Sequence, residues 1–450
     1  MKKNGSDLQQ LDLLFDSAVK ERRECRFIDL FAGLGGTRIG LEEALIDLGF
    51  SPKCVFTSEI KPYAIEAYKK NFNDDDIQGD ITKIDSKDIP DFDILLAGFP
   101  CQPFSSAGSR KGFGDTRGTL FFEIERILKE KSPSGFLLEN VEGLVNHNHG
   151  DTLRTIIFHL EQLGYIVSWR VINAAEVGIP QSRKRIYIVG NKKEKVSLDD
   201  IHKISTNLDS ILEKGLPVLN TTLTKKLLNK YKLEDLYGKA VKDKRGGKNN
   251  IHSWDIELKG PVSNEQKQLL EKIVCERRNK KWADLKGITW MDGMPLTIEE
   301  ISTFDSHNKD TLKKMLDDLA DKGYLSYEHP KDVVLYEENG KTLSKRVPDT
   351  SKPKGYNIVA GKLSFEISKI LDPFNVAPTL VATDVSRLAV IDTNGLRRLS
   401  IREGLRLFGY PETYSLEMLN YTDAYDLLGN TVVVPVIKEV AIKLIKAILS

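Results

Sequence analysis

Cys101 is the residue whose type and surroundings point most directly to chemistry. It stands in the run GFPCQPFS, directly after an apolar stretch that predicts a buried strand. Open α/β sheets bind ligands beyond the carboxyl ends of their strands, and Pro100 and Pro103 restrict the backbone on either side of the cysteine. A lone cysteine is more often a buried structural thiol, but this context predicts a positioned nucleophile. The remaining cysteines lack such a context and are interpreted as structural: Cys25, Cys54 and Cys275.

A carboxylate and two guanidinium groups accompany other expected strands. Glu139 stands at the end of the strand expected in LLENVEGL. Arg183 and Arg185 alternate along the strand expected in QSRKRIYIVG, so both side chains should face the same side of the sheet. Two such arginines could instead form surface ion pairs. The residues alone leave both interpretations open.

A glycine-rich turn stands in FIDLFAGLGGTRIG at 27–40. Such a turn lets a ligand approach the backbone closely. The spacing of Gly33, Gly35 and Gly36 is not the G-x-G-x-x-G fingerprint, which disfavours a pyrophosphate cofactor. Glu59, at the end of the second expected strand, can accept hydrogen bonds from both ribose hydroxyls, and Asp80 can do the same for an adenine amino group. Each acid alone is more often a solvated loop residue or a helix cap, but with the turn they predict a nucleoside-bearing cofactor site.

The elements that position these groups alternate between strand and helix. Apolar runs predict strands at 26–33, 53–60, 92–100, 135–141 and 183–190. Helical periodicity predicts helices at 37–50, 61–72 and 119–133, a short helix within residues 1–24, and a long amphipathic helix over 427–449. The alternation predicts an α/β fold with a doubly wound, mostly parallel sheet.

Beyond residue 191 the composition changes. Residues 221–290 contain 17 Lys and Arg against 9 Asp and Glu, an excess that fits contact with phosphates; a solvated basic face on an unrelated insert is the alternative. Within 295–336, two amphipathic helices precede two β-prone segments. This order predicts a winged-helix-like unit whose second helix could lie in the major groove of DNA, or else a helical packing module.

The whole-chain composition limits the classes of protein. The formal net charge is +1, so any nucleic-acid contact must use locally concentrated positive charge. No two cysteines form a Cys-x-x-Cys pair and no histidines cluster beside them, so we expect no metal site. Few cysteines, no signal peptide and no apolar run of about 18 residues predict a cytoplasmic protein that does not contact a membrane.

Taken in order, these motifs resemble the DNA (cytosine-5) methyltransferase family of the bacterial restriction-modification type. The shared features are the FAGLGG turn, Pro-Cys-Gln, Glu-Asn-Val, Gln-x-Arg-x-Arg, RRLSIREGLRLFGYP at 397–411 and GNTVVVPV at 429–436. The resemblance covers roughly residues 27–191 and 379–450.

The resemblance implies the S-adenosylmethionine-dependent methyltransferase fold with a second, smaller target-recognition domain. Residues 1–191 would form the catalytic, cofactor-binding domain, completed by 425–450. The target-recognition domain would span 192–400, and residues 401–424 would form a hinge.

It also implies roles for the residues at the strand ends. Cys101 matches the nucleophile that adds to carbon 6 of cytosine, so that carbon 5 can attack a sulfonium methyl group. Glu139 matches the residue that hydrogen-bonds N3 and the exocyclic amino group of the base. Arg185 matches the residue at O2 of cytosine, and Arg183 belongs to the same motif. The base must leave the duplex to reach these groups, so base flipping is implied.

The implied cofactor is S-adenosyl-L-methionine, converted to S-adenosyl-L-homocysteine. The positions that match the family's cofactor contacts are Phe31, Leu34, Gly36, Glu59, Ile60, Asp80, Ile81, Gly98, Pro100, Leu120, Asn430 and Val432. Ile60 stands where an aromatic residue often stacks on adenine, so we expect weaker stacking here. The residues expected to contact DNA are Gln102, Ser105, Arg110, Lys111 and Thr379.

The resulting prediction is a DNA (cytosine-5-)-methyltransferase that acts on double-stranded DNA as a monomer and protects it from a cognate restriction endonuclease. An RNA cytosine methyltransferase on the same scaffold is the first alternative, but the long basic insert argues against it, since tRNA-methylating relatives have a small one. A catalytically inactive DNA-binding regulator is the second, and the intact catalytic motifs argue against that. The glycine spacing disfavours a nicotinamide-dependent oxidoreductase.

Overall fold

The computed structural model describes residues 23–100, 120–201, 204–289, 293–338, 341–359, 365–381, 385–393 and 395–450. Contacts divide the chain into two compact units. The first comprises Met1–Leu212, Phe374–Ser386 and Ser400–Ser450, and the second comprises Glu213–Pro373 and Arg387–Leu399. The helix expected within residues 1–24 lies almost wholly outside the described residues.

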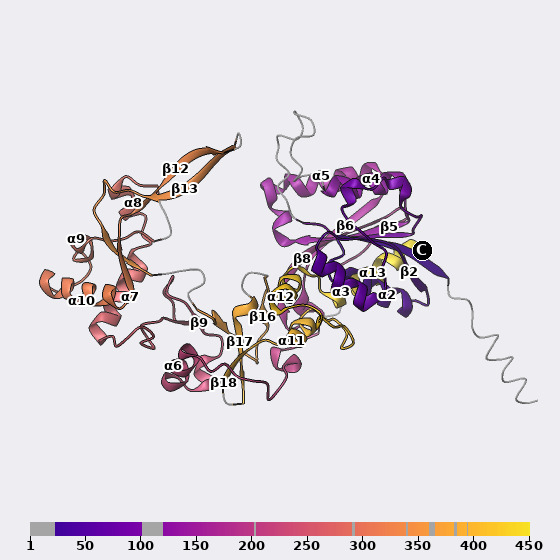
Figure 1. The fold of residues 1–450 in the computed structure, drawn as a ribbon. Helices are drawn as coiled ribbons and strands as arrows, with labels where there is room; N and C mark the ends of the chain where they lie inside the picture. The colour runs from indigo at the N-terminus through magenta and orange to yellow at the C-terminus, as the bar shows by residue number, and fades with distance from the viewer. Residues whose placement is uncertain are drawn as a thin grey trace, which may run out of the picture. The chain divides into compact units, whose positions relative to one another are not determined.

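A seven-stranded sheet forms the centre of the first unit (Figure 1). Across the sheet the strands are β3 (Ile77–Gln78), β2 (Ser51–Ser58), β1 (Glu24–Leu30), β4 (Ile94–Gly98), β5 (Gly135–Val141), β8 (Lys184–Asn191) and β6 (Ile166–Asn173). Neighbouring strands are parallel from β3 to β5, whereas β8 runs antiparallel to both β5 and β6. The predicted doubly wound, mostly parallel sheet is confirmed, with β8 as its antiparallel strand.

Helices cover both faces of this sheet (Figure 1). They are α2 (Gly36–Asp47), α3 (Pro62–Phe72), α4 (Leu120–Lys131), α5 (Asp151–Gln162) and α13 (Val434–Leu449). Helices α4 and α5 bury apolar stripes in a core that they share with the inner strands. Helices α2 and α13 pack on each other on the opposite face. These helices can cover the sheet because their apolar residues recur at helical spacing. The apolar stripe of each helix is buried, and the opposite face contacts water.

The C-terminal segment departs from the prediction of one long helix. It forms two helices, α12 (Tyr421–Asn430) and α13, with Thr431–Val433 between them. Pro435 lies in the first turn of α13. A proline is tolerated there because the first amide groups of a helix have no intrahelical partner, whereas further inside it would remove a hydrogen bond and clash with the preceding turn. The prediction of an unbroken helix over 427–449 was therefore wrong.

The second unit contains a small sheet and a helical module. The small sheet has the order β10 (Asn250–Ile251), β9 (Ala240–Val241), β15 (Lys369–Ile370), β17 (Leu388–Asp392) and β18 (Gly395–Arg398). A buried ion pair between Arg397 and Asp392, with an Nε to Oδ2 distance of 2.7 Å, joins β18 to β17. None of the helices in the described ranges combines the length and apolar character that crossing a membrane would require.

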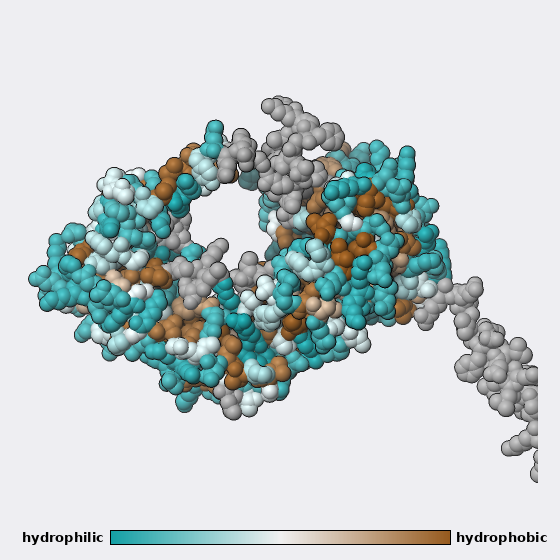
Figure 2. Space-filling view, viewed as in Figure 1, coloured by the Kyte–Doolittle hydropathy of each residue, from teal (hydrophilic) through white to brown (hydrophobic). Residues whose placement is uncertain are grey.

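The helical module has its own apolar core. Its elements are α7 (Asn264–Glu276), α8 (Lys281–Lys286), α9 (Ile298–Ile301), α10 (Lys309–Asp321), β11 (Leu325–Glu328), β12 (Lys331–Glu338), β13 (Lys341–Pro348) and β14 (Gly355–Ile358). Strand β14 pairs with β11 and, through a bridge between Tyr356 and Leu296, with the segment before α9. Strands β12 and β13 form a separate hairpin. Figure 2 shows apolar surface on this hairpin, and Val334 and Leu335 are exposed apolar residues of β12.

Residues 295–336 include α9, α10, β11 and most of β12, and that they form a winged-helix-like unit stays a prediction. Helix α10 carries three lysines and four aspartates. Lys313 pairs with Asp317, and Lys322, just beyond the helix, pairs with Asp318. Its charge therefore does not favour phosphate contact, and its insertion into the major groove stays a prediction.

The two packed helices generate a testable prediction for stability. A Cβ at Gly40 on α2 would lie 2.6 Å from the Cβ of Ile437 and 2.9 Å from the carbonyl oxygen of Val434 on α13. Gly40→Ala should therefore lower the free energy of unfolding by about 1–3 kcal/mol through overpacking, as measured by urea denaturation. Gly79→Ala is the matched control, since its Cβ would meet nothing within 4 Å. Equal stability of the two variants would contradict the close contact.

Candidate active site

A cavity of ≈ 490 Å³ opens at the carboxyl ends of strands β1, β2, β4 and β5. The residues Leu427, Gly429, Asn430 and Thr431, near the end of the chain, also line it. The predicted site residues around it are Phe31, Leu34, Glu59, Ile60, Asp80, Ile81, Gly98, Pro100, Leu120, Glu139, Arg183, Arg185 and Asn430. The structure thus brings together the motifs that were predicted to bind the cofactor and the base.

Two predicted cofactor contacts do not line this cavity: Gly36 and Val432. A Cβ at Gly36 would lie 2.7 Å from the hydroxyl of Tyr410 and 2.8 Å from a methyl group of Val432. This lack of space explains why glycine stands at position 36. Without a side chain there, Tyr410 and Val432 can pack directly on the turn. Contact of Gly36 and Val432 with the cofactor stays a prediction.

The glycine-rich turn has a backbone conformation that favours glycine at two positions. Gly33 and Gly35 have φ angles of 54° and 69°, in the left-handed region that glycine adopts without strain. Phe31, just before the turn, shares this region with a φ of 55°. A Cβ at Gly35 would also lie 2.4 Å from the ring of Phe72 on α3. The turn is further fixed by Tyr414, whose hydroxyl donates to the carbonyl oxygen of Leu34 at 2.7 Å.

Glu59 uses its carboxylate to hold the turn. Its Oε2 accepts a hydrogen bond from the backbone amide of Gly33 at 2.8 Å. Its Oε1 accepts from the amides of Ile60 and Lys61 at 2.8 and 2.9 Å. The buried carboxylate therefore ties the first strand end to the second. Its Oε2, which accepts one hydrogen bond, retains a lone pair with which it could accept a ribose hydroxyl.

The adenine end of the expected site has an apolar and an acidic side. Ile60 is 68% exposed at the rim, where it can cover a flat ring. Asp80 caps the turn Ile81–Lys83, because its Oδ1 accepts hydrogen bonds from the amide and the hydroxyl of Thr82. These hydrogen bonds lower the pKa of Asp80 and keep it ionised, so it can accept a hydrogen bond from an amino group.

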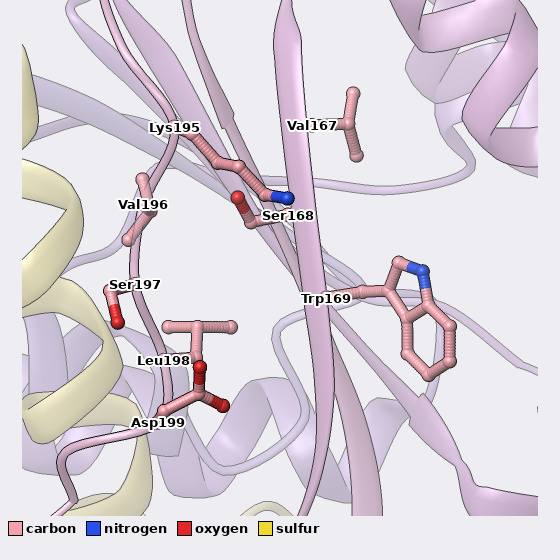
Figure 3. Close-up of a pocket in the computed structure, with 8 residues that line it drawn as sticks. All are labelled: Val167, Ser168, Trp169, Lys195, Val196, Ser197, Leu198 and Asp199. Carbon is pink, nitrogen blue, oxygen red and sulfur yellow. The ribbon is translucent and has the colours of Figure 1, made fainter.

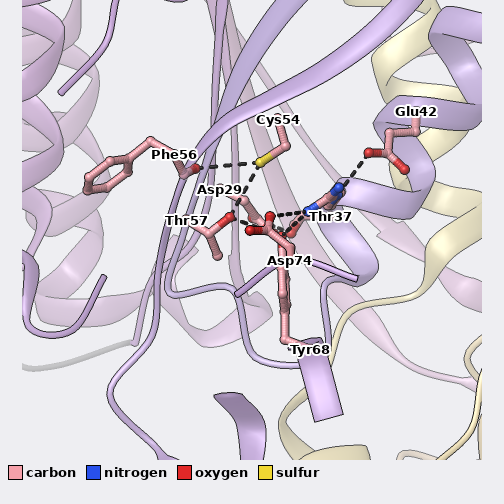
Figure 4. Close-up of polar contacts among 9 residues, drawn as sticks. Asp29, Thr37, Glu42, Cys54, Phe56, Thr57, Tyr68 and Asp74 are labelled. Carbon is pink, nitrogen blue, oxygen red and sulfur yellow. Dashed lines mark hydrogen bonds and ion pairs between the residues drawn. The ribbon is translucent and has the colours of Figure 1, made fainter. Parts of the chain in front are cut away.

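Asp29 lies beneath the turn in a buried polar network (Figure 4). Its Oδ1 accepts from the hydroxyl of Thr37 at 2.7 Å, which attaches the first turn of α2 to β1. Tyr68 lies at 3.4 Å from its Oδ2 and also contacts Thr57. Burial raises the pKa of Asp29 to about 7, although the hydrogen bond from Thr37 and the charge of Arg38 oppose this shift. The network was not predicted; a polar residue within the apolar run FIDLF was its only signal.

Glu139 and Arg185 form the charged centre of the cavity. They lie on the antiparallel strands β5 and β8, where Glu139 pairs with Tyr187 and Val141 pairs with Arg185. The Nε of Arg185 is 3.2 Å from the Oε1 of Glu139. Burial raises the pKa of Glu139, and the guanidinium groups of Arg185 and Arg183 oppose this shift. A buried carboxyl group with a raised pKa can donate a proton or a hydrogen bond to a base.

Arg183 has a different environment from Arg185. It is buried, and its guanidinium donates to the carbonyl oxygens of Leu380 and Thr431 at 3.0 and 2.7 Å. It also lies over the ring of Phe408. These contacts attach the segment that carries the two arginines to the segment after α12, so Arg183 positions two walls of the cavity that it lines.

Asn140 is a site residue that the sequence analysis did not single out. Its side-chain amide donates to the carbonyl oxygen of Phe99 at 3.0 Å, and its own oxygen accepts from the amide of Val141. It therefore fixes the backbone just before Cys101. Its position beside Glu139 in the Glu-Asn-Val motif was the available signal.

Thr379 lies on the first unit, next to the motif that carries the arginines. Its hydroxyl donates to the carbonyl oxygen of Ser182 at 2.6 Å. Gln181, which is fully buried, accepts from the amide of Leu380 and donates to the carbonyl oxygen of Leu407. Contact of Thr379 with DNA stays a prediction.

The predicted nucleophile and the neighbouring DNA contacts lie outside the described residues. They are Cys101, Gln102, Ser105, Arg110 and Lys111. Pro100, the residue before the cysteine, lines the cavity together with Glu139 and Arg185. The chain therefore enters the segment that carries Cys101 from the edge of this cavity.

A second groove, of ≈ 470 Å³, follows strand β6 and residues Lys195–Asp199 (Figure 3). Ser168 points toward Lys195, whereas Val167 and Trp169 point to the other side of the strand. The groove contains none of the predicted site residues. The cavity at the strand ends is therefore the candidate active site.

The chain is similar to known DNA-modifying enzymes along its length. The family described as C-5 cytosine-specific DNA methylase matches residues 25–446. Type II methyltransferase M.NlaIV of Neisseria lactamica is 58% identical, over 94% of this chain and 99% of the relative. Type II methyltransferase M.NgoBV of Neisseria gonorrhoeae is 56% identical with the same coverage, and M.BanI of Aneurinibacillus aneurinilyticus is 40% identical over 92% and 94%.

A solved structure shares the fold. The crystal structure of the S. pombe Dnmt2 methyltransferase aligns with a TM-score of 0.51 and 16% identity, over 94% of this chain and 99% of that one. At this identity the likeness shows the fold alone. Together with the sheet order and the cavity at its strand ends, it defines an S-adenosylmethionine-dependent methyltransferase fold.

The chain belongs to the C-5 cytosine-specific DNA methylases, and its activity is methylation of carbon 5 of cytosine in DNA.

The buried network under the turn generates a prediction for pH dependence. The pKa of Asp29 is raised from 3.8 to about 7, so between these values the folded state holds a proton that the unfolded state releases. The stability that this proton confers is complete below about pH 4 and is lost as the pH rises through about 7. Between about pH 4 and pH 8 the wild type should therefore lose unfolding free energy relative to Asp29→Asn, as measured by urea denaturation. Asp75→Asn, at a carboxylate that is 95% exposed, should not differ in this way, and a common pH profile for all three proteins would rule out the titration.

Proposed function

We propose that the enzyme transfers the methyl group of S-adenosyl-L-methionine to a flipped-out cytosine in a specific double-stranded DNA sequence, through a covalent bond between Cys101 and carbon 6. The observation that carries this proposal is the pairing of Glu139 with Arg185 in the same cavity as Glu59 and the glycine-rich turn. One part of the cavity suits a pyrimidine and the other part suits a nucleoside.

The cavity fits the proposed cofactor in size and chemistry. Its volume of ≈ 490 Å³ lies in the range of about 300–1,000 Å³ that is usual for small-molecule sites. Glu59 offers the Oε2 of its carboxylate to a ribose hydroxyl, and Phe31 and Leu120 offer apolar surface. When bound, S-adenosyl-L-methionine supplies an electrophilic methyl group on a sulfonium ion, and the product is S-adenosyl-L-homocysteine.

Glu139 and Arg185 would prepare the base. A cytosine ring attacked at carbon 6 gathers negative charge on N3 and O2. Burial raises the pKa of Glu139, so its carboxyl group can hydrogen-bond or protonate N3, and Arg185 can donate to O2. The ion pair between them orients both groups before the base arrives, so little reorganisation is needed during the reaction.

Cys101 would supply the nucleophile. Its thiolate forms a bond to carbon 6, which turns carbon 5 into an enamine carbon that can take the methyl group. Loss of the proton from carbon 5 then restores the double bond, and the bond between sulfur and carbon 6 breaks. Because the thiolate is the reactive form, its release regenerates the starting enzyme.

The second unit would select the target sequence, since its residues 221–290 carry the excess of positive charge. We further propose that the enzyme acts as a monomer in the cytoplasm, beside a cognate restriction endonuclease.

Incubation with tritiated S-adenosyl-L-methionine and mixed-sequence DNA tests the reaction. Folded protein that places no label on cytosine would overturn the proposal.

The nucleophile is tested by trapping with 5-fluorocytosine DNA. Fluorine at carbon 5 cannot leave as a proton does, so the wild type should accumulate a covalent adduct that shifts its mobility in denaturing gels. Cys101→Ala should form no adduct. Cys54→Ala, at a partly buried cysteine outside the cavity, should form as much adduct as the wild type. An adduct in Cys101→Ala would assign the nucleophile to another residue.

The role of Glu139 is tested by Glu139→Gln, which keeps the shape of the side chain but cannot transfer a proton. We expect kcat to fall by about 10²–10⁴, the usual contribution of a positioned acid or base. The Kd for S-adenosyl-L-homocysteine, measured by calorimetry, should stay within about twofold. An unchanged kcat in this variant would show that protonation of the base does not depend on Glu139.

A further inference from the structure

An ion pair spans the rim of the cavity on the side of Ile60. The Nζ of Lys61 lies 2.9 Å from the Oδ2 of Asp426. Lys61 follows the second strand, and Asp426 lies on α12, 365 positions later in the chain. Lys61 itself lines the cavity, as do Leu427 and Asn430 just beyond Asp426. The pair therefore joins two walls of the cavity that are remote in sequence.

One further hydrogen bond strengthens this contact. The hydroxyl of Tyr63 donates to the same Oδ2 of Asp426 at 2.6 Å. Partial burial alone would raise the pKa of Asp426, but the hydrogen bonds from Tyr63 and Lys61 hold it below its usual value. Asp426 therefore stays ionised at neutral pH and keeps both donors in place.

Asp426 also orients a predicted cofactor contact. The side-chain amide of Asn430 donates to the backbone oxygen of Asp426 at 2.8 Å and lies 3.4 Å from its Oδ1. Asn430 is exposed at the rim. Asp426 therefore restrains Asn430 mainly through its backbone oxygen, with a longer contact from its carboxylate.

On the inner side of the cavity, buried hydrogen bonds hold the C-terminal wall in place of an ion pair. There Arg183 and Tyr410 hold Thr431, through a guanidinium bond to its carbonyl oxygen and a hydroxyl contact of 2.6 Å to its side chain. These groups are buried and depend on packing. The contact between Lys61 and Asp426 is partly exposed, with side chains 41% and 33% accessible, so it can open without disturbing the core.

From this geometry we infer that Lys61 and Asp426 form a latch across the rim of the cofactor cavity, which positions Asn430 and slows the release of the nucleoside-bearing cofactor. Both are positioning residues and neither takes part in methyl transfer. The inference rests on the proposed cofactor site, and it adds a specific determinant of how long the cofactor stays bound.

Direct binding of S-adenosyl-L-homocysteine tests the latch. Calorimetry on Asp426→Asn and Lys61→Met should show a Kd about three- to tenfold above that of the wild type, as expected for loss of a partly exposed ion pair with its hydrogen bonds. Steady-state assays should show a similar rise in KM for S-adenosyl-L-methionine, with kcat and the KM for DNA unchanged. A merely structural pair would instead lower the melting temperature and affect both substrates.

Exchange of the two charges distinguishes an effect of the ion pair from separate effects of Lys61 and Asp426. The variant that combines Lys61→Glu with Asp426→Lys should recover a Kd within about twofold of the wild type, whereas each substitution alone should not. Lys438→Met is the matched control, because Lys438 pairs with Asp47 outside the cavity lining, and it should bind as the wild type does.

The outcomes distinguish the latch from the cofactor site itself. Wild-type protein that binds no S-adenosyl-L-homocysteine would overturn the cofactor assignment and the latch with it. Normal binding by the wild type and by both single variants would overturn the latch alone. The latch would also be overturned if the charge-exchanged variant lost as much affinity for S-adenosyl-L-homocysteine as the two single substitutions combined. The two residues would then act independently.

Discussion

Helix α13 packs against α2 at Gly40, and the segment before it packs against the turn at Gly36. Both contacts are close enough that a methyl group on either glycine would meet side-chain or carbonyl atoms at less than 3 Å. The cavity depends on this return of the chain, because the sheet supplies the turn, the acids and the arginines. The remaining wall consists of Leu427, Gly429, Asn430 and Thr431. Residues near the two ends of the sequence therefore complete one site.

Buried charge is the second constraint on the site. Asp29, Glu139 and Arg183 are all removed from water, and each would be unfavourable there without partners. Their partners are the same groups that build the cavity: Thr37 at the start of α2 for Asp29, Arg185 for Glu139, and backbone oxygens of Leu380 and Thr431 for Arg183. The polar interactions that satisfy these charges thus also fix the geometry of the walls.

The contacts of the C-terminal segment also bear on the predicted domain organisation. Residues 401–424 were expected to form a hinge, but contacts assign them to the first unit, where Tyr414 bonds to the turn and Tyr410 contacts Thr431. The first unit extends to Leu212 rather than 191. A change of composition marked the start of the insert, but composition does not show which residues still pack on the sheet.

The sequence by itself determined the class of fold and most of the candidate site. Alternation of apolar runs and helical periodicity located the strands and helices of the first unit, because burial on a sheet face and on a helix stripe imposes these periods. Ordered motifs located the acids and arginines, because a site at strand ends needs particular residues at the ends of particular strands. The tertiary structure alone decided what each polar group contacts: that Arg183 is bonded to the chain's own carbonyl oxygens, that Asn140 holds the backbone before Cys101, and that Asp426 reaches Lys61 across the rim. These contacts join residues up to 365 positions apart, and no local pattern of residues encodes a distance that only the packed chain creates.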